Sequence, residues 1–201
     1  PYQTWINSGV TKNSSAELKV KHETYDDYAE RKASVSNMPT SFVDGLNFYL
    51  AKYPYGCSEQ IVSKAYPFIY KDVAKVAGLS QEDVNARVDE VIGILQSRIK
   101  SDGNIGYWTN KSETNDFITL YCAEFLTDAT EQGFFVPSTF MTNVLKAVEV
   151  IASDSEEKRD AHIRAYAIYI LTKNAEVTTH YIEDLESDLS IFDSESEYEK
   201  L

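Results

Sequence analysis

The 201-residue chain is acidic: 32 aspartates and glutamates against 19 lysines and arginines give it a formal net charge of -13. Because surfaces that bind phosphate backbones need clustered lysine and arginine, this charge argues against a nucleic-acid partner. The 43% of apolar residues can fill the core of one large domain with a smaller appendage. No apolar run reaches the roughly 18 residues needed to cross a bilayer.

The chain changes character near residue 37. Residues 1–36 contain short alternating stretches, such as residues 16–21, between polar runs, and alternation of this kind predicts strands and loops. Beyond that point apolar residues recur at helical spacing, beginning with a helix that Pro54 closes. We therefore expect two domains, residues 1–36 and residues 37–201.

The second expected helix runs from Cys57 to about Ala77, with Gly78 as its stop. Pro67 lies inside that helix and predicts a kink or a break there. Ser80, backed by Asp83, has the pattern of a capping box and predicts the start of the next helix.

The remaining helical segments alternate in character. Residues 84–99 and 141–151 each carry one apolar face, whereas residues 115–128 and 163–171 are apolar around most of the helix. A last amphipathic helix is expected around residues 181–189. Outer helices alternating with enclosed ones predict a mainly α fold of helical hairpins stacked into an α/α toroid, with a plain bundle as the alternative. Since seven helices would leave such a ring open, we expect the chain to be truncated at its carboxyl end.

The two cysteines lie in different surroundings. Cys122 belongs to a mostly apolar segment and is expected to be a buried core residue. Cys57 follows Gly56 and opens a helix, where the positive end of the helix dipole favours a thiolate. Cys57 is therefore the cysteine with a chemical role.

Cys57 and Gln60 are three positions apart, so their side chains lie on neighbouring turns of the backbone. Attack of the sulfur on the carboxamide carbon of Gln60, with loss of ammonia, would leave an internal thioester. A thioester hydrolyses in water unless it is shielded. Aromatic residues that surround the site in sequence are candidates for that shield, each with an ordinary core position as the alternative: Tyr49, Tyr53 and Tyr55 before Cys57, and Tyr66 and Phe68 after it.

The string Tyr53-Pro-Tyr-Gly-Cys-Ser-Glu-Gln60 closely resembles the thioester signature of the alpha-2-macroglobulins, and of their bacterial branch in particular. Four further segments are similar to successive landmarks of that family's thioester domain. They occur in the expected order between residues 38 and 175: residues 102–108, 115–121, 133–137 and 164–169.

The resemblance implies a toroid domain over residues 37–201 in which Cys57 and Gln60 form the thioester and Glu59 has a supporting role. It implies that residues 1–36 belong to an adjoining β-rich domain. The implied function is that of a thioester module in a bacterial broad-spectrum protease inhibitor, rather than an enzyme, that traps attacking proteases by acylating their amines.

The resemblance also implies partners and a location. The partners would be host or competitor proteases and the other macroglobulin domains of the same chain, without a cofactor or a metal. The location would be the bacterial cell envelope, with the full-length protein periplasmic or anchored as a lipoprotein.

Two enzyme classes stay open on the residues alone. Helical-ring enzymes share glycine and aromatic motifs like residues 102–108, but they need clustered aspartates or a zinc set, and neither is visible. Cys57 is also a candidate nucleophile of a hydrolase or transferase, with His162 or His180 as its base. His162 lies too close to the next helix to match the histidine by which complement-type relatives acylate hydroxyl groups, so amines are the expected targets.

Overall fold

The computed structural model describes residues 56–153 and 160–192, which belong to a unit spanning residues 54–201. Predictions for the earlier part of the chain fall outside these residues. They concern the strands, the domain boundary near residue 36, the helix before Pro54, and the shield candidates Tyr49, Tyr53 and Tyr55.

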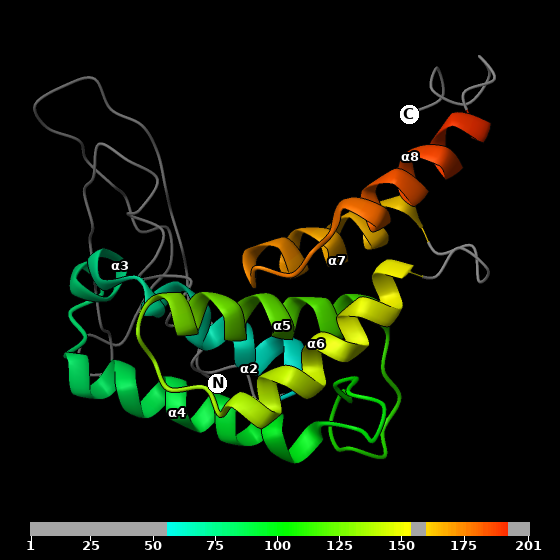
Figure 1. Ribbon diagram of the computed structural model, residues 1–201. Coiled ribbons are helices and arrows are strands. Elements are labelled where there is room, and N and C mark those ends of the chain that lie inside the picture. Colours follow the sequence, from blue (N-terminus) through cyan, green and yellow to red (C-terminus); the bar gives the residue numbers. More distant parts are fainter. Residues whose placement is uncertain (1–55, 154–159, 193–201) are drawn as a thin grey trace, which may run out of the picture. The chain divides into compact units, whose positions relative to one another are not determined.

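Within the described ranges the chain is helical (Figure 1). The elements in chain order are α2 (Ser58–Ala65), the 3₁₀ turn η3 (Tyr66–Ile69), α3 (Lys71–Val76), α4 (Gln81–Arg98), α5 (Asp116–Glu131), α6 (Ser138–Ser153), α7 (Ala161–Lys173) and α8 (Thr179–Phe192). These ranges contain no β-strand, only an isolated bridge between Ile99 and Ile105. None of these helices combines the length and the apolar character that crossing a lipid bilayer requires. The mainly α fold predicted from the periodicity is confirmed.

The helix break at Pro67 and the helix start at Ser80 occur where the sequence predicts them. Pro67 lies in the 3₁₀ turn η3 and divides the segment expected as one helix into α2, η3 and α3, because proline lacks an amide donor and clashes with the preceding turn. At the start of α4, the Asp83 amide donates to Ser80 Oγ at 3.1 Å, and the Ser80 amide donates to the Asp83 carboxylate at 3.1 Å. The predicted capping box is therefore confirmed.

Three helices end in a left-handed cap. The residue after the last turn has a positive φ at the ends of α3, α5 and α7: +69° at Gly78, +89° at Gly133 and +60° at Ala175. In each case the amides of this residue and of the next donate to carbonyls in the last helical turn, which is the Schellman pattern. Ala175 adopts this conformation although its Cβ makes it unfavourable.

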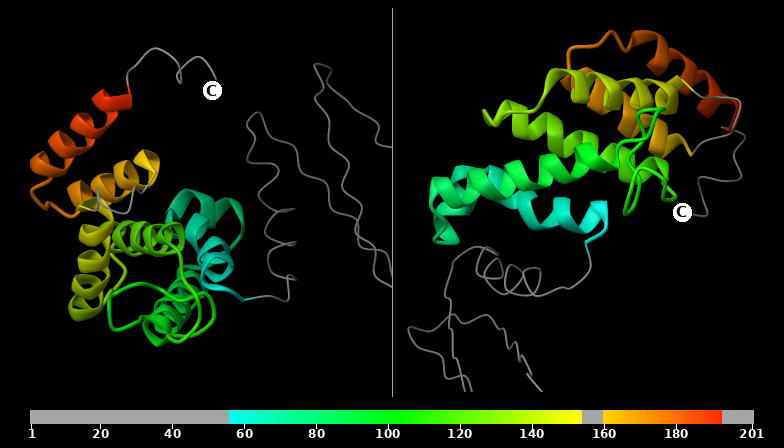
Figure 2. Two further views of the ribbon diagram at one scale, coloured as in Figure 1. Left: turned by 90° about the vertical axis from the view of Figure 1, so that its right-hand side faces the viewer. Right: turned by 90° about the horizontal axis from the view of Figure 1, so that it is seen from below.

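Helix α5 lies at the centre of the described helices. It packs against α2, η3 and α4 on one side and against α6 and α7 on the other (Figures 1 and 2). Helix α7 packs against α5, α6 and α8 but keeps an exposed face that includes Ala165, Tyr169 and Thr172, and α4 and α6 also bury a single face. The predicted inner position is confirmed for α5 and the predicted outer position for α4 and α6, whereas α7, expected to be an inner helix, has an exposed face because no described helix covers that side.

The segment between α4 and α5 folds back beside the start of α2. The Gly106 amide donates to the carbonyl of Arg98 at 3.1 Å, and the Ile105 amide donates to Thr119 Oγ1 of α5 at 3.2 Å. Ile105 is fully buried. Since an added Cβ on Gly106 would lie 2.0 Å from the carbonyl oxygen of Thr109, this tight path requires glycine.

Candidate functional site

Cys57 and Gln60 meet at the first turn of α2. Cys57 is the N-cap, with extended backbone (φ -65°, ψ 162°), and Gln60 is the third residue of the helix. The backbone amide of Gln60 is directed to the Cys57 side chain, while the Gln60 side-chain oxygen accepts the Cys57 amide at 3.3 Å. The two side chains therefore lie together, as their spacing predicts.

The residues of this first turn differ in their exposure to solvent. Cys57 is 7% exposed, Gln60 is half-buried, and Glu59 points into solvent. Cys57 is a free thiol in this structure, so the thioester stays a prediction. Within the described residues the Glu59 side chain forms no hydrogen bond with Cys57 or Gln60, and its supporting role stays a prediction too.

Cys122 is the second free thiol, and it is fully buried in α5. Burial raises the pKa of Cys122 well above its usual value, against a smaller opposite effect of the Arg98 charge. Its expected place in the core is confirmed, and at neutral pH it is a protonated, poorly nucleophilic thiol.

The landmark loop over residues 102–108 holds the start of α2 in place. Ser58 is completely buried; its amide donates to the carbonyl of Tyr107 at 2.9 Å, and its hydroxyl donates to the carbonyl of Gly106 at 2.7 Å. These two bonds fix the residue that follows Cys57. The loop thus has a positioning role at the site, which the sequence suggested only through its similarity to a family landmark.

Arg98, the last residue of α4, places a cation at the same point. Its Nη1 donates to the carbonyl of Tyr107 at 3.0 Å and to the hydroxyl of Ser58 at 3.2 Å. Desolvation lowers the pKa of Arg98, while its electrostatic interactions with the thiols of Cys57 and Cys122 act in the opposite direction. The guanidinium remains charged at any physiological pH.

Sequence reasoning did not single out Ser58 or Arg98. Ser58 lies inside the signature string, so it was within reach of the motif argument. Arg98 carried no such signal, because a basic residue in the last turn of a helix is ordinarily explained by the helix dipole.

The histidines proposed as a base for Cys57 lie elsewhere. His162, in the first turn of α7, and His180, in the first turn of α8, are both exposed, and the His180 ring lies tilted against Tyr181 with 3.7 Å between centroids. Across residues 56–153 and 160–192 no histidine hydrogen-bonds to Cys57, and no group of His, Cys, Asp and Glu is arranged to hold a metal ion.

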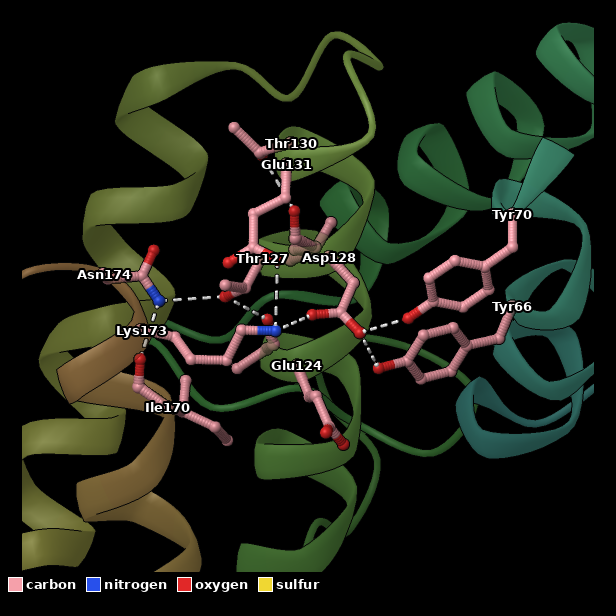
Figure 3. Close-up of polar contacts among 12 residues, drawn as sticks. Tyr66, Tyr70, Glu124, Thr127, Asp128, Thr130, Glu131, Ile170, Lys173 and Asn174 are labelled. Carbon is pink, nitrogen blue, oxygen red and sulfur yellow. Dashed lines mark hydrogen bonds and ion pairs between the residues drawn. The ribbon is translucent and has the colours of Figure 1, made fainter.

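A second polar cluster centres on Asp128 of α5 (Figure 3). Its buried carboxylate accepts hydrogen bonds from the hydroxyls of Tyr66 at 2.7 Å and Tyr70 at 2.9 Å, and it forms an ion pair with Lys173 of α7. Burial disfavours the carboxylate, but the hydrogen bonds from Lys173 and the two tyrosines outweigh burial and lower the pKa of Asp128. Burial and the bond to Asp128 raise the pKa of Tyr70 to about 12. The cluster cross-links η3, α5 and α7.

Comparison with known proteins gives relatives of one kind. No family model matches the chain. The chain is 31% identical over 192 residues to the alpha-2-macroglobulin homolog of Yersinia pestis. The aligned region covers 94% of this chain and 10% of that protein. The chain spans about a tenth of the length of the curated relatives it matches.

Two solved structures share its fold. Salmonella alpha-2-macroglobulin reacted with methylamine aligns with a TM-score of 0.64 at 22% identity, over 72% of this chain and 10% of that one. Trypsin-activated alpha-2-macroglobulin from Escherichia coli aligns with a TM-score of 0.59 at 23% identity, over 66% of this chain and 10% of that one. At these identities the likeness supports the fold.

Proposed function

Because the chain is homologous to one segment of the bacterial alpha-2-macroglobulins, we propose that it is the thioester module of such a protein, with Cys57 and Gln60 as the cross-linked pair. The observation that carries the proposal is the reciprocal pairing of these two residues at the start of α2. Each side chain reaches the backbone amide of the other residue, so the ring would close within one helical turn.

The bond would form by exchange of ammonia for sulfur. The Cys57 thiolate attacks the side-chain carbonyl carbon of Gln60, a carbon–sulfur bond forms, and the carbon–nitrogen bond breaks. The nitrogen leaves as ammonia after taking up the thiol proton. The low exposure of Cys57 and the buried anchor at Ser58 would keep water away from the sulfur side of the product.

The thioester would then act once, as an acylating group. An amine of the target attacks the Gln60 carbonyl carbon, a new amide bond forms, and the thiol of Cys57 is released. Since the module is consumed in this step, it is an inhibitor component and not an enzyme. One structural neighbour was reacted with methylamine and another was activated by trypsin, which supports amines as nucleophiles and proteases as targets.

The partners follow from the same proposal. In the full-length protein the module would act on host or competitor proteases, together with the other macroglobulin domains of its chain. The proposed location is the bacterial cell envelope, either periplasmic or anchored as a lipoprotein.

The alternative of a cysteine-dependent enzyme has less support. General-base activation needs a histidine within hydrogen-bonding reach of the thiol, and neither His162 nor His180 has such a contact in the part of the chain that the structure describes. A helical-ring enzyme with a metal has no ligand cluster within that part either.

Intact-mass spectrometry tests the thioester directly. We expect freshly purified chain to be lighter by one ammonia, about 17 Da, and its Cys57 to resist iodoacetamide until methylamine opens the bond. Methylamine should then appear as an N-methylamide at Gln60 in the peptide map. Cys57→Ala should show full mass and take up no methylamine, whereas the matched Cys122→Ala should behave like the parent chain.

A hydrolysed thioester remains distinguishable from one that never formed. Hydrolysis leaves a free Cys57 and converts the amide of residue 60 to a carboxylate, which the peptide map detects. Full mass together with an unmodified Gln60 amide and an immediately alkylated Cys57 would refute the proposal.

A further inference from the structure

Arg98 is a half-buried cation whose hydrogen bonds lead to uncharged oxygens. They are the carbonyl of Tyr107 and the hydroxyl of Ser58, at 3.0 and 3.2 Å. Within residues 56–153 and 160–192 Arg98 forms no ion pair with a carboxylate. A partly desolvated charge that none of these residues neutralises is unfavourable for folding within this part of the chain.

The guanidinium lies near the start of α2, where Cys57 would carry negative charge during thioester chemistry. Its contact residue Ser58 directly follows Cys57, and its electrostatic interaction with the Cys57 thiol exceeds that with Cys122. Cys122 is sealed in the core and stays protonated. The sulfur of Cys57 is therefore the group whose negative charge Arg98 can stabilise.

Among the described residues, the other ionisable groups around α2 do not replace this charge. Glu59 is exposed, and its negative charge is screened by solvent. Burial raises the pKa of Tyr121 on α5, so Tyr121 stays neutral at physiological pH. The basic groups of Lys64, in the last turn of α2, and of Arg87, which donates to the Lys64 carbonyl at 3.4 Å, belong to the opposite end of that helix.

We propose that Arg98 is a positioning residue for the thioester reaction, whose fixed positive charge stabilises the thiolate of Cys57. When the thioester forms, this charge favours the nucleophilic form of the sulfur. When an amine opens the thioester, the carbon–nitrogen bond forms, the carbon–sulfur bond breaks, and the electron pair stays on the sulfur beside Arg98. The amine proton passes to solvent. The inference rests on the proposed function for the reaction, but its effect on the Cys57 thiol does not require a thioester.

The thiol pKa of Cys57 tests the proposal without any thioester. In a Cys122→Ala, Gln60→Ala background Cys57 is the sole thiol and no ring can close. Its pKa is then measured from thiolate absorbance at various pH values. Arg98→Gln keeps a donor for the Tyr107 carbonyl but removes the charge, and should raise the pKa of Cys57 by about 1. Arg98→Lys keeps the charge and should leave that pKa near the parent value.

A purely structural role gives a different result. In that case Arg98→Gln and Arg98→Lys would leave the pKa of Cys57 unchanged while both proteins fold, as judged by circular dichroism, and the proposal would be wrong. Arg98→Met is the second neutral variant, to be used if Arg98→Gln does not fold.

The second readout uses the chain with Gln60 and Cys122 restored. A thiolate that is harder to form is a poorer leaving group, so Arg98→Gln should slow the opening of the thioester by methylamine about threefold. Arg98→Lys should react at a rate close to that of the parent. Absence of the thioester from the parent would contradict the proposed function alone, because the thiol pKa still decides the role of Arg98.

Discussion

A partly buried cation lies near each end of the segment formed by α2 and η3, and the two cations have different kinds of partner. Beyond η3, Lys173 pairs with Asp128, whose carboxylate also accepts hydrogen bonds from Tyr66 and Tyr70. At the start of α2, Arg98 donates to uncharged oxygens, and none of the described residues supplies a carboxylate to it. The Asp128 end has its charges compensated, whereas the Arg98 end retains a positive charge beside a thiol.

This difference separates a structural cross-link from a chemical site. At the Asp128 end the two tyrosine hydroxyls and Lys173 share one carboxylate, and removing one partner of the ion pair leaves a buried charge unpaired. At the Arg98 end no carboxylate of the described residues neutralises the cation, which can therefore stabilise a transient anion by electrostatic preorganisation. The first cluster should therefore govern stability, and the second should govern the reactivity of Cys57.

The largest expected effect comes from breaking the Asp128 end. Asp128→Ala should lower the free energy of unfolding by about 3 kcal/mol, because Lys173 and two tyrosine hydroxyls lose their common partner. Urea denaturation measures the loss. Glu131→Ala, which removes the more exposed partner of Lys173 at 3.3 Å, is the control and should cost less than about 1 kcal/mol. Equal losses in the two variants would show that the cluster is not the cross-link we describe.

A smaller loss is expected from disturbing the loop at the Arg98 end. In Gly106→Ala the new Cβ would lie 2.0 Å from the Thr109 carbonyl oxygen, so the loop must shift, at a cost of about 2 kcal/mol. The bonds from Ser58 to this loop would loosen, and Cys57 should alkylate faster with iodoacetamide. The control is Gly93→Ala, where the Cβ meets no atom within 4 Å and the helix should gain stability. Unchanged alkylation of a destabilised Gly106→Ala chain would contradict the anchoring role of the loop.

The smallest expected effect comes from a substitution after α7 that should stabilise the Asp128 end. Ala175 follows Lys173 and Asn174 and has a φ of +60°, a conformation that glycine adopts without strain. Ala175→Gly should raise the free energy of unfolding by about 1 kcal/mol, measured by thermal denaturation, and leave the thiol pKa of Cys57 unchanged. Its counterpart, Gly133→Ala at φ +89°, should lower stability. A loss of stability in Ala175→Gly would show that this cap is not strained.

The features predicted correctly from sequence depend on neighbours in the chain. Pro67 breaks a helix because of its own ring, Gly78 ends one through its own backbone, and the capping box of Ser80 and Asp83 spans a single turn. The pairing of Cys57 with Gln60 was predictable for the same reason, since three positions along a helix bring two side chains together.

The sequence by itself therefore determined the helices and the meeting of Cys57 with Gln60 at one helical turn. Only the tertiary structure decided that Arg98 of α4, Ser58 of α2 and the carbonyl of Tyr107 converge beside Cys57. It also brought Asp128 to Lys173 and the two tyrosines. These contacts join residues far apart in the chain, and their geometry depends on how whole helices pack, which no periodicity within a single segment encodes.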